Sequence, residues 1–245
     1  MSLRGLIFDV DGTLADTEEV HRQAFNAAFA LQRLPWFWGH RVYCELLKVA
    51  GGRERLAHFI DALEISAAEK MKLLARVAAI HSDKTRFYAR FVAEGRVALR
   101  EGVSALLEEA RHADLKLALA TTTSYANVEA LFTHSLGRQA LKWFAVTATG
   151  ETRLPKKPAP DIYIHVLGKL RLAPREVIAF EDSEIGVKAA KAAGIFTVVA
   201  PTIWTAGDDL SAADLRLDGL ATRCDVHSLA KAYSRSLKVR GREAA

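Results

Sequence analysis

The sequence predicts an α/β fold in which a parallel sheet, covered by helices on both faces, is interrupted by a long helical insert. Residues 3–8 form a short apolar run without alternation, as buried parallel strands do. From about Glu18 to Phe91 the apolar residues instead recur at helical spacing. After Gly95 strand-like and helix-like segments alternate, and this alternation requires a sheet with both faces covered.

The helical insert shows two apolar stripes and one capping signal. The stripes consist of Val20, Ala24, Phe25, Ala28 and Phe29, and of Leu56, Phe59, Ile60 and Leu63. Ser66 and Glu69 have the spacing of a capping box, ahead of a helix that we expect over residues 71–91. The one place where a strand could interrupt the insert is near Val42.

The second half of the chain follows a strand–helix order. We expect helices over 102–113, from near Pro158, and over 184–194, and strands over 115–120, 177–180 and 196–200. The simplest architecture is a Rossmann-like core of residues 1–16 and 96–245, with a helical cap of residues 17–95 inserted after the first strand.

Composition limits the classes of function. The 245 residues are 50% hydrophobic and carry a net charge of +5, with a sequence pI near 9.2. The basic residues are spread along the chain, apart from the tail from Ser234, which we expect to be frayed. Cys44 and Cys224 belong to no metal or redox motif, and no leader or membrane-spanning segment is expected. These features favour a cytoplasmic protein that binds neither nucleic acid nor membrane. We expect a monomer, although the sequence leaves the oligomeric state open.

Polar residues gather where the expected strands end. The clusters are Asp9 and Asp11, Thr121 to Ser124, Lys156 and Lys157, and Glu181 and Asp182. Ligands of open parallel sheets bind outside the carboxyl ends of the strands, so these carboxylates, hydroxyls and ammonium groups should converge at one edge.

This inventory suits phosphoryl transfer. Neighbouring carboxylates repel one another unless a cation neutralises them, and an all-oxygen set suits Mg²⁺. A cation, a lysine and a hydroxyl together form a receptor for a phosphoryl group. Of the two aspartates after the first strand, one is therefore expected to attack phosphorus and the other to move a proton.

Each cluster taken alone has an ordinary structural explanation. The aspartate pair could form an Asx turn, Thr121 could cap the next helix, and Lys157 could be a solvated side chain. Glu181 and Asp182 could interact with a helix dipole. All four clusters in this order are much harder to explain in that way.

The motifs resemble those of a known family. DVDGTLADT, LALATTTS, KKPAPDIY and AFEDS are similar to the four motifs of the haloacid dehalogenase superfamily of phosphohydrolases. Within it, DTEEVHRQAFNAAF, YCELLKVAGGRER and TTTSYANVEAL resemble the beta-phosphoglucomutase-like branch, and there the CbbY-type sugar-bisphosphate phosphatases. The resemblance covers nearly the whole chain. It implies a ketopentose bisphosphate as substrate, with xylulose 1,5-bisphosphate the leading candidate.

The resemblance also implies a role for each residue of the motifs. Asp9 would be the nucleophile and Asp11 the general acid–base. Thr121 and Lys157 would neutralise the phosphoryl oxygens. Mg²⁺ would be held by a carboxylate oxygen of Asp9, the backbone carbonyl of Asp11, and Asp182, with Glu181 supporting or joining.

The cap would recognise the rest of the substrate. Glu18 and His21 lie one helical turn apart, so both could face the site. Tyr43 is either a core residue or a hydroxyl contact, and the resemblance favours a contact. Trp36 and Trp38 are expected to pack inside the cap.

A glycine pair in the cap suggests a site for a distal phosphate. Gly51 and Gly52 could merely break a helix, but Arg53 and Arg55 follow them, so backbone N–H groups and guanidinium groups could bind an anion there. The remaining candidates for substrate binding are Thr122, Thr123 and Asn127.

Two stretches depart from the family pattern. Arg153 stands in a loop where a more acidic sequence is expected, and residues 202–223 resemble the family only loosely. Both departures would alter the mouth of the site.

Other functions remain open. A phosphomutase would use the same aspartate and return the phosphate to a sugar. A phospho-receiver domain would lack the long insert, a haloacid dehalogenase in the narrow sense would not need the second aspartate, and a non-catalytic phosphate-binding protein would not need every motif residue intact.

Overall fold

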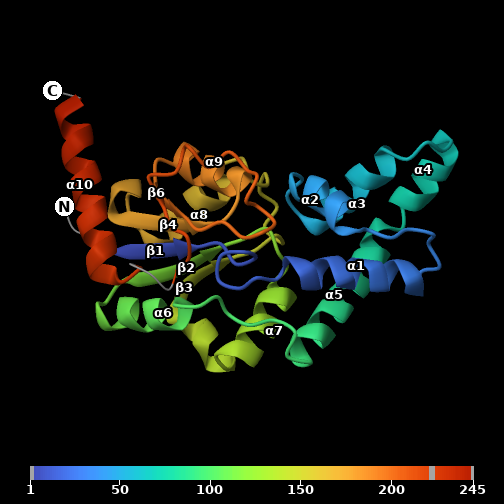
Figure 1. The fold of residues 1–245 in the computed structure, drawn as a ribbon, viewed down its shortest axis with the longest axis horizontal. Helices are drawn as coiled ribbons and strands as arrows, with labels where there is room; N and C mark the ends of the chain where they lie inside the picture. The colour runs from blue at the N-terminus through green and yellow to red at the C-terminus, as the bar shows by residue number, and fades with distance from the viewer. Residues whose placement is uncertain (1–2, 221–223, 244–245) are drawn as a thin grey trace.

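A single six-stranded parallel sheet forms the centre of the molecule (Figure 1). The computed structural model describes residues 3–220 and 224–243. The strands are β1 (Gly5–Phe8), β2 (Lys116–Ala120), β3 (Phe144–Ala148), β4 (Val177–Glu181), β5 (Phe196–Val199) and β6 (Leu215–Arg216). Their order is β3-β2-β1-β4-β5-β6, and every neighbouring pair is parallel. The expected α/β fold with a parallel sheet is therefore confirmed. β1 lies in the middle, so the residues that follow it reach the centre of one sheet edge.

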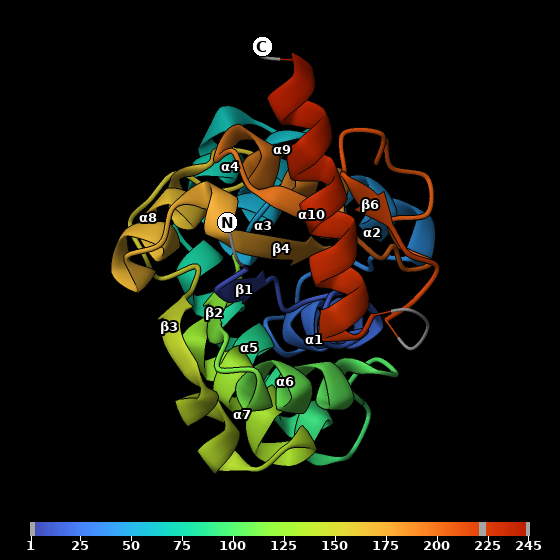
Figure 2. The same ribbon diagram turned by 90° about the vertical axis from the view of Figure 1, so that its left-hand side faces the viewer.

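Helices cover both faces of the sheet (Figure 2). α6 (Val103–His112), α7 (Tyr125–Ser135) and α10 (Val226–Glu243) lie on one face, and α8 (Asp161–Leu170) and α9 (Glu184–Ala192) lie on the other. The strands are apolar without alternation because both of their faces are buried: Leu6 and Phe8 point into one core, and Ile7 points into the other.

The first five of the six helices that the structure describes between β1 and β2 form the opposite end of the molecule in Figure 1. They are α1 (Glu18–Leu31), α2 (His40–Leu47), α3 (Gly52–Asp61), α4 (Ala67–Leu74) and α5 (Val77–Ala93). They bury most of a separate hydrophobic cluster, in which Phe25, Phe29 and Trp38 contact one another through their rings. Trp36 packs edge-on against Phe29, so both tryptophans pack inside this group, as expected. The separate cluster supports our division into a cap at 17–95 and a core, which stays a proposal.

Most expected elements are present, and the capping box of Ser66 and Glu69 forms. The strand considered near Val42 is wrong, because this residue lies in α2. The helix expected over 71–91 is two helices, since α4 ends at Leu74 and α5 begins at Val77.

Three further expectations need correction. The helix placed near Pro158 begins only at Asp161. The sequence analysis missed β3, a half-exposed strand at the sheet edge whose apolar signal is correspondingly weak. The tail from Ser234 is not frayed: it continues α10 to Glu243, and the last two residues lie outside the described part of the chain.

In the described part of the chain, no helix combines the length and the apolar character needed to cross a lipid bilayer.

Candidate active site

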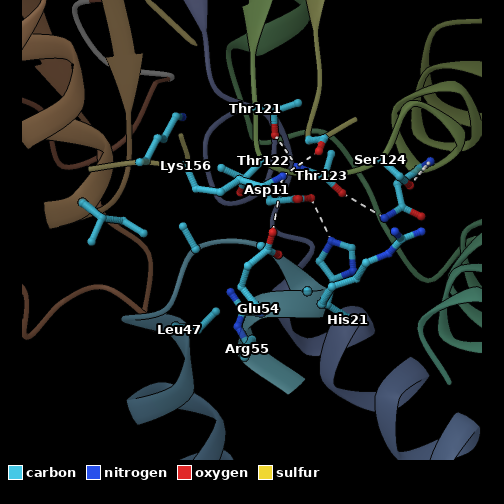
Figure 3. Close-up of a pocket in the computed structure, with 18 of the residues that line it drawn as sticks. Asp11, His21, Leu47, Glu54, Arg55, Thr121, Thr122, Thr123, Ser124 and Lys156 are labelled. Atoms are coloured by element: carbon cyan, nitrogen blue, oxygen red, sulfur yellow. Dashed lines mark hydrogen bonds and ion pairs between the residues drawn. The ribbon is translucent and has the colours of Figure 1, made fainter. Parts of the chain in front are cut away.

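A pocket of about 890 Å³ lies between the carboxyl ends of the strands and the cap helices (Figure 3). Its floor is the tight turn that follows β1, in which the Gly12 amide donates to the Ala15 carbonyl and the Leu14 amide to the Val10 carbonyl. Gly12 has φ +80°, and a Cβ there would stand 2.2 Å from Oδ2 of Asp182. Glycine is therefore required at this position both by the backbone and by the carboxylate that approaches it.

A buried lysine links the ends of β1 and β4. Nζ of Lys157 lies 2.7 Å from Oδ1 of Asp9 and 2.6 Å from Oε1 of Glu181. The hydroxyl of Tyr163, on α8, donates to the same Glu181 oxygen. Lys157 is therefore not a solvated side chain, and its position between the two carboxylates raises its pKa although burial opposes this.

Three buried carboxylates make this corner a candidate metal site. Asp9, Glu181 and Asp182 each offer an oxygen, and these oxygens lie within 4.8 Å of one another. Oε2 of Glu181 is buried without a hydrogen-bond partner. Burial raises the pKa of Asp9 to about 8 and that of Asp182 well above its ordinary value, with repulsion from Glu181 adding to both. One lysine cannot balance three carboxylates, so the donor set fits a hard divalent cation.

Asp11 points away from these carboxylates and into the cap. Its Oδ1 accepts from the Thr17 hydroxyl at 2.7 Å and lies 2.9 Å from Nε2 of His21. Burial alone would raise the pKa of Asp11, but His21 and Thr17 outweigh it and hold the pKa well below its ordinary range. The carboxylate expected to move protons is thus held in place by cap helix α1.

A lysine that the sequence analysis did not single out completes this arrangement. Nζ of Lys84, on α5, lies 2.6 Å from Nδ1 of His21. Burial lowers the pKa of Lys84 to about 8, so it is mostly protonated at neutral pH and can only donate to His21. Both ring nitrogens of His21 are thus engaged, one by Lys84 and the other by Asp11.

Hydroxyl and amide groups line the pocket beyond β2. Oγ1 of Thr121 is buried and accepts from the Thr123 amide, while the Asn127 amide donates to the Thr123 hydroxyl. Oδ1 of Asn127 is buried without a partner. Thr121, Thr122, Thr123 and Asn127 all line the pocket. They leave hydroxyls and one amide oxygen available to a ligand.

The structural explanations of the single clusters do not hold. Ser124, not Thr121, caps α7. Ser183, not Glu181 or Asp182, caps α9. The turn after β1 is closed by backbone hydrogen bonds and not by an Asx interaction of its aspartates.

Tyr43 corrects one expectation. Its side chain is fully buried and does not line the pocket, so it is not a direct contact to a ligand. Its hydroxyl instead donates to Oε2 of Glu18 at 2.8 Å and accepts from Nη1 of Arg55 at 2.9 Å. Tyr43 therefore holds two pocket residues in place from behind.

The glycine pair opens α3 toward the pocket. Gly51 has φ +90°, α3 begins at Gly52, and both line the pocket together with Arg53 and Arg55. Arg55 also donates to the carbonyls of the preceding turn, so part of its role is structural.

His81 was missed by the sequence analysis. It lies on α5 beside Gly52, where a Cβ would stand 2.6 Å from its Nε2. Burial, aided by nearby cations, lowers the pKa of His81 to about 3, so the imidazole is neutral. Nothing near it in the sequence signals this position.

The two sides of the pocket meet directly in Figure 3, where Lys156 extends toward Glu54. Nζ of Lys156 lies 3.9 Å from Oε1 of Glu54 and donates to the Gly150 carbonyl. All the sequence-predicted site residues except Tyr43 line this one pocket, and Arg153 does so as well. The cap and the strand ends therefore share a single site.

Comparison with known proteins decides the family. The profile of the haloacid dehalogenase-like hydrolases matches residues 3–194. The chain is 46% identical over 221 residues to protein CbbY of Rhodobacter capsulatus, which spans 90% of this chain and 95% of that protein. The chain is a haloacid dehalogenase-like hydrolase of the CbbY group. It is accordingly a phosphatase of this family.

Solved structures agree with this family. CbbY from Rhodobacter sphaeroides in complex with phosphate has a TM-score of 0.87 and 42% identity, covering 93% of this chain and 99% of that one. A mutant of the same protein in complex with xylulose-(1,5)bisphosphate has a TM-score of 0.86 and 41% identity over the same shares. The sheet order and the helices between β1 and β2 therefore belong to a fold that binds phosphate in a relative.

Proposed function

We propose that this CbbY-group phosphatase is a Mg²⁺-dependent sugar-phosphate phosphatase that acts through an aspartyl-phosphate on Asp9. The substrate we infer is a ketopentose bisphosphate such as xylulose 1,5-bisphosphate. One observation carries this proposal: the pocket that contains Asp9 and Lys157 continues to the start of α3 and Arg53 in the cap. A ligand with a phosphate at each end matches a pocket with a cationic group at each end.

Positively charged side chains at the cap end of the pocket support the binding of a second anionic group of the substrate. Besides the lysine next to Asp9, the cations that line the pocket are Lys48, Arg53, Arg55, Lys84, Arg86, Arg153 and Lys156. The amide groups at the start of α3 add the positive end of a helix dipole. Arg53 and Arg55, in the first turns of α3, are thus cations in addition to the lysine that would serve the transferred phosphoryl group.

The first step would form a bond between a carboxylate oxygen of Asp9 and phosphorus while the bond from phosphorus to the sugar oxygen breaks. Lys157, 2.7 Å from Asp9, would neutralise the phosphoryl oxygens together with the Thr121 hydroxyl. The sugar oxygen would leave with a proton from Asp11. In the second step, Asp11 would take a proton from water, which attacks phosphorus and frees Asp9 and inorganic phosphate.

Asp11 must be protonated in the first step and unprotonated in the second. Its lowered pKa suits the second step. A bound phosphate dianion would raise the pKa for the first step, because a like charge nearby disfavours the carboxylate.

Asp9, Glu181 and Asp182 would hold Mg²⁺, with the backbone carbonyl of Asp11 as a further ligand. The ion would supply positive charge beside the transferred phosphoryl group. Its binding would also relieve the repulsion that raises the pKa values of Asp9 and Asp182.

The relative of known structure supports the choice of substrate, since a mutant of it was crystallised with xylulose-(1,5)bisphosphate at 41% identity to this chain. The proposal carries that ligand over to this protein. In this protein, the cap residues that would bind the ligand are Glu18, His21 and Arg53.

The test is a phosphate-release screen with Mg²⁺ over pentose and hexose mono- and bisphosphates. We expect the highest kcat/KM for a ketopentose bisphosphate, with stoichiometric release of inorganic phosphate. Conversion of a hexose 1-phosphate to a 6-phosphate only when a bisphosphate primer is added, without net phosphate release, would instead identify a phosphomutase. Failure of every bisphosphate to exceed its monophosphate would contradict the proposed substrate class.

A further inference from the structure

A core segment after β5 belongs to the hydrophobic cluster of the cap. Trp204 is 7% exposed and packs in the cluster formed by Phe25, Trp38 and Leu56. Among the described residues, it is the one buried member of that cluster that comes from outside 17–95. The sequence analysis had noted only that this stretch departs from the family pattern.

The contacts of Trp204 are specific. Its ring stacks on His40 with centroids 5.0 Å apart and planes within 8° of parallel, and meets Tyr43 edge-on at 5.7 Å. Both partners lie on α2, toward which the segment after β5 extends in Figures 1 and 2. Two differently oriented ring contacts define the place of α2 over the core more closely than apolar contact alone would.

The base of this segment is held rigidly. The Trp204 amide donates to the Thr202 hydroxyl at 3.1 Å, and the Thr202 amide donates to the Thr205 hydroxyl at 3.0 Å. Arg100 donates to the carbonyls of Ala200 at 2.6 Å and Pro201 at 3.1 Å.

Arg100 also donates to the Gly12 carbonyl, in the turn that carries Asp11. The segment that carries Trp204 and the turn that carries Asp11 are thus held by the same arginine side chain. A displacement of Arg100 would therefore move both the segment that carries Trp204 and the turn that carries Asp11.

Trp204 itself lines the pocket, and Tyr43 connects it to two further residues of the pocket wall. The hydroxyl of Tyr43 holds Glu18 and Arg55, both of which line the pocket, and its ring contacts Trp204. We infer that Trp204 is a positioning residue, which holds α2 closed over the pocket and so aligns Glu18 and Arg55 for the part of the substrate that lies in the cap. For its effect on substrate choice, this inference rests on the proposed function, because it concerns selection of a bisphosphate.

The test compares Trp204→Ala with Trp204→Phe, which keeps a flat ring against His40 and Tyr43. The control is Trp36→Ala, since Trp36 packs against Phe29 and Phe59 within the cap. The first readout, which needs no substrate, is hydrogen–deuterium exchange of His40–Leu47 in the free protein.

In that readout we expect exchange in α2 to be at least tenfold faster in Trp204→Ala than in the wild type, with Trp204→Phe close to the wild type and β4 unchanged in both. Unchanged exchange in α2 would overturn the inference whatever the substrate proves to be.

The second readout is kcat/KM for xylulose 1,5-bisphosphate relative to p-nitrophenyl phosphate. We expect Trp204→Ala to lower this ratio at least fivefold, Trp204→Phe to restore it, and Trp36→Ala to leave it unchanged even where its melting temperature falls. A ratio preserved in Trp204→Ala would overturn the inference. A wild type without preference for the bisphosphate would instead count against the proposed function, and exchange in α2 would then decide the role of Trp204.

If Trp204→Ala does not fold, His40→Ala tests the same contact, because the His40 side chain is 66% exposed and its loss removes the stacking partner of Trp204. His40 also lies 3.6 Å from Glu19, which does not line the pocket. We expect faster exchange in α2 and a lower ratio of kcat/KM values, with the logarithm of each change about half of that for Trp204→Ala. No change in either readout would overturn the inference.

Discussion

The two sides of the pocket are built differently. At the strand ends, Asp9, Lys157 and Glu181 are buried and interact mainly through charge, at distances of 2.6 to 2.7 Å. On the cap side, Glu18 and Arg55 are held through the hydroxyl of Tyr43, whose ring lies in an aromatic cluster.

This difference supports the proposed division of work between the strand ends and the cap. The side chains at the strand ends are fixed by a central sheet and can stabilise charge without rearrangement, as catalysis of phosphoryl transfer requires. The cap side chains keep their positions only while α2 and α3 stay docked. We therefore expect core substitutions to affect every substrate alike and cap substitutions to discriminate between substrates.

The largest expected effect is that of Asp9→Asn. An amide cannot attack phosphorus, so turnover should fall by roughly a thousandfold or more for both sugar phosphates and p-nitrophenyl phosphate. Burial raises the pKa of Asp9 to about 8, so the neutral side chain should keep or raise the melting temperature. Steady-state kinetics and a thermal melt test both statements. Near-normal phosphate release would rule out the covalent mechanism.

Removal of divalent cations should have a comparable effect. Activity should be lost after exhaustive EDTA treatment and return with Mg²⁺. Because three carboxylates share one lysine, Mg²⁺ should also raise the melting temperature of the free protein, and Asp182→Asn should abolish that rise. Full activity of the metal-free protein would contradict the metal site.

Arg53→Ala should distinguish the two sides of the pocket. A charged hydrogen bond is worth about 1.5–3 kcal/mol, so KM for a bisphosphate should rise by roughly tenfold or more. KM for p-nitrophenyl phosphate should change much less, because that ligand cannot span the pocket.

Arg55→Ala should act in the same direction but also lower stability, since Arg55 donates to the carbonyls of Leu46 and Val49. Arg138→Ala is the matched control, because Arg138 lies on the exposed surface of the sheet-containing part and does not line the pocket. Equal weakening of both substrates by Arg53→Ala would mean that the residue acts on cap folding or closure.

The smallest expected effect concerns Lys84. Burial lowers its pKa to about 8, so raising the pH through 8 removes the proton that it donates to His21. Activity should therefore fall on the alkaline side with a midpoint near pH 8. In Lys84→Arg, which stays protonated, this limb should move upward by about a pH unit or more. Lys72→Arg, on the exposed surface of α4, should leave the pH profile unchanged, and an unmoved limb in Lys84→Arg would assign the titration to another group.

The sequence predicted the core side of the site better than the cap side for a physical reason. Parallel strands end at one edge, so Asp9, Thr121 and Asp182 had to converge once the strands were recognised. The strand that was missed, β3, is half-exposed at the sheet edge and lacks the continuous apolar run of a buried strand.

The cap side depends on contacts between distant parts of the chain. Lys84 meets His21 across two helices, and Trp204 reaches Tyr43 from beyond the fifth strand. Local periodicity carries no signal for such pairs. It also cannot tell a ligand contact from a residue behind the pocket wall, which is why the prediction for Tyr43 was wrong.

The central claim is that the strand ends perform the chemistry while the cap selects a second phosphate. The most direct test measures kcat/KM of the wild type and of Arg53→Ala for xylulose 1,5-bisphosphate and for a xylulose monophosphate, which differ only in the distal phosphate. We predict that the wild type prefers the bisphosphate by roughly tenfold or more, and that Arg53→Ala loses most of this preference while handling the monophosphate almost as the wild type does. Equal kcat/KM of the wild type for the two sugars, or a preference that Arg53→Ala leaves intact, would contradict the claim.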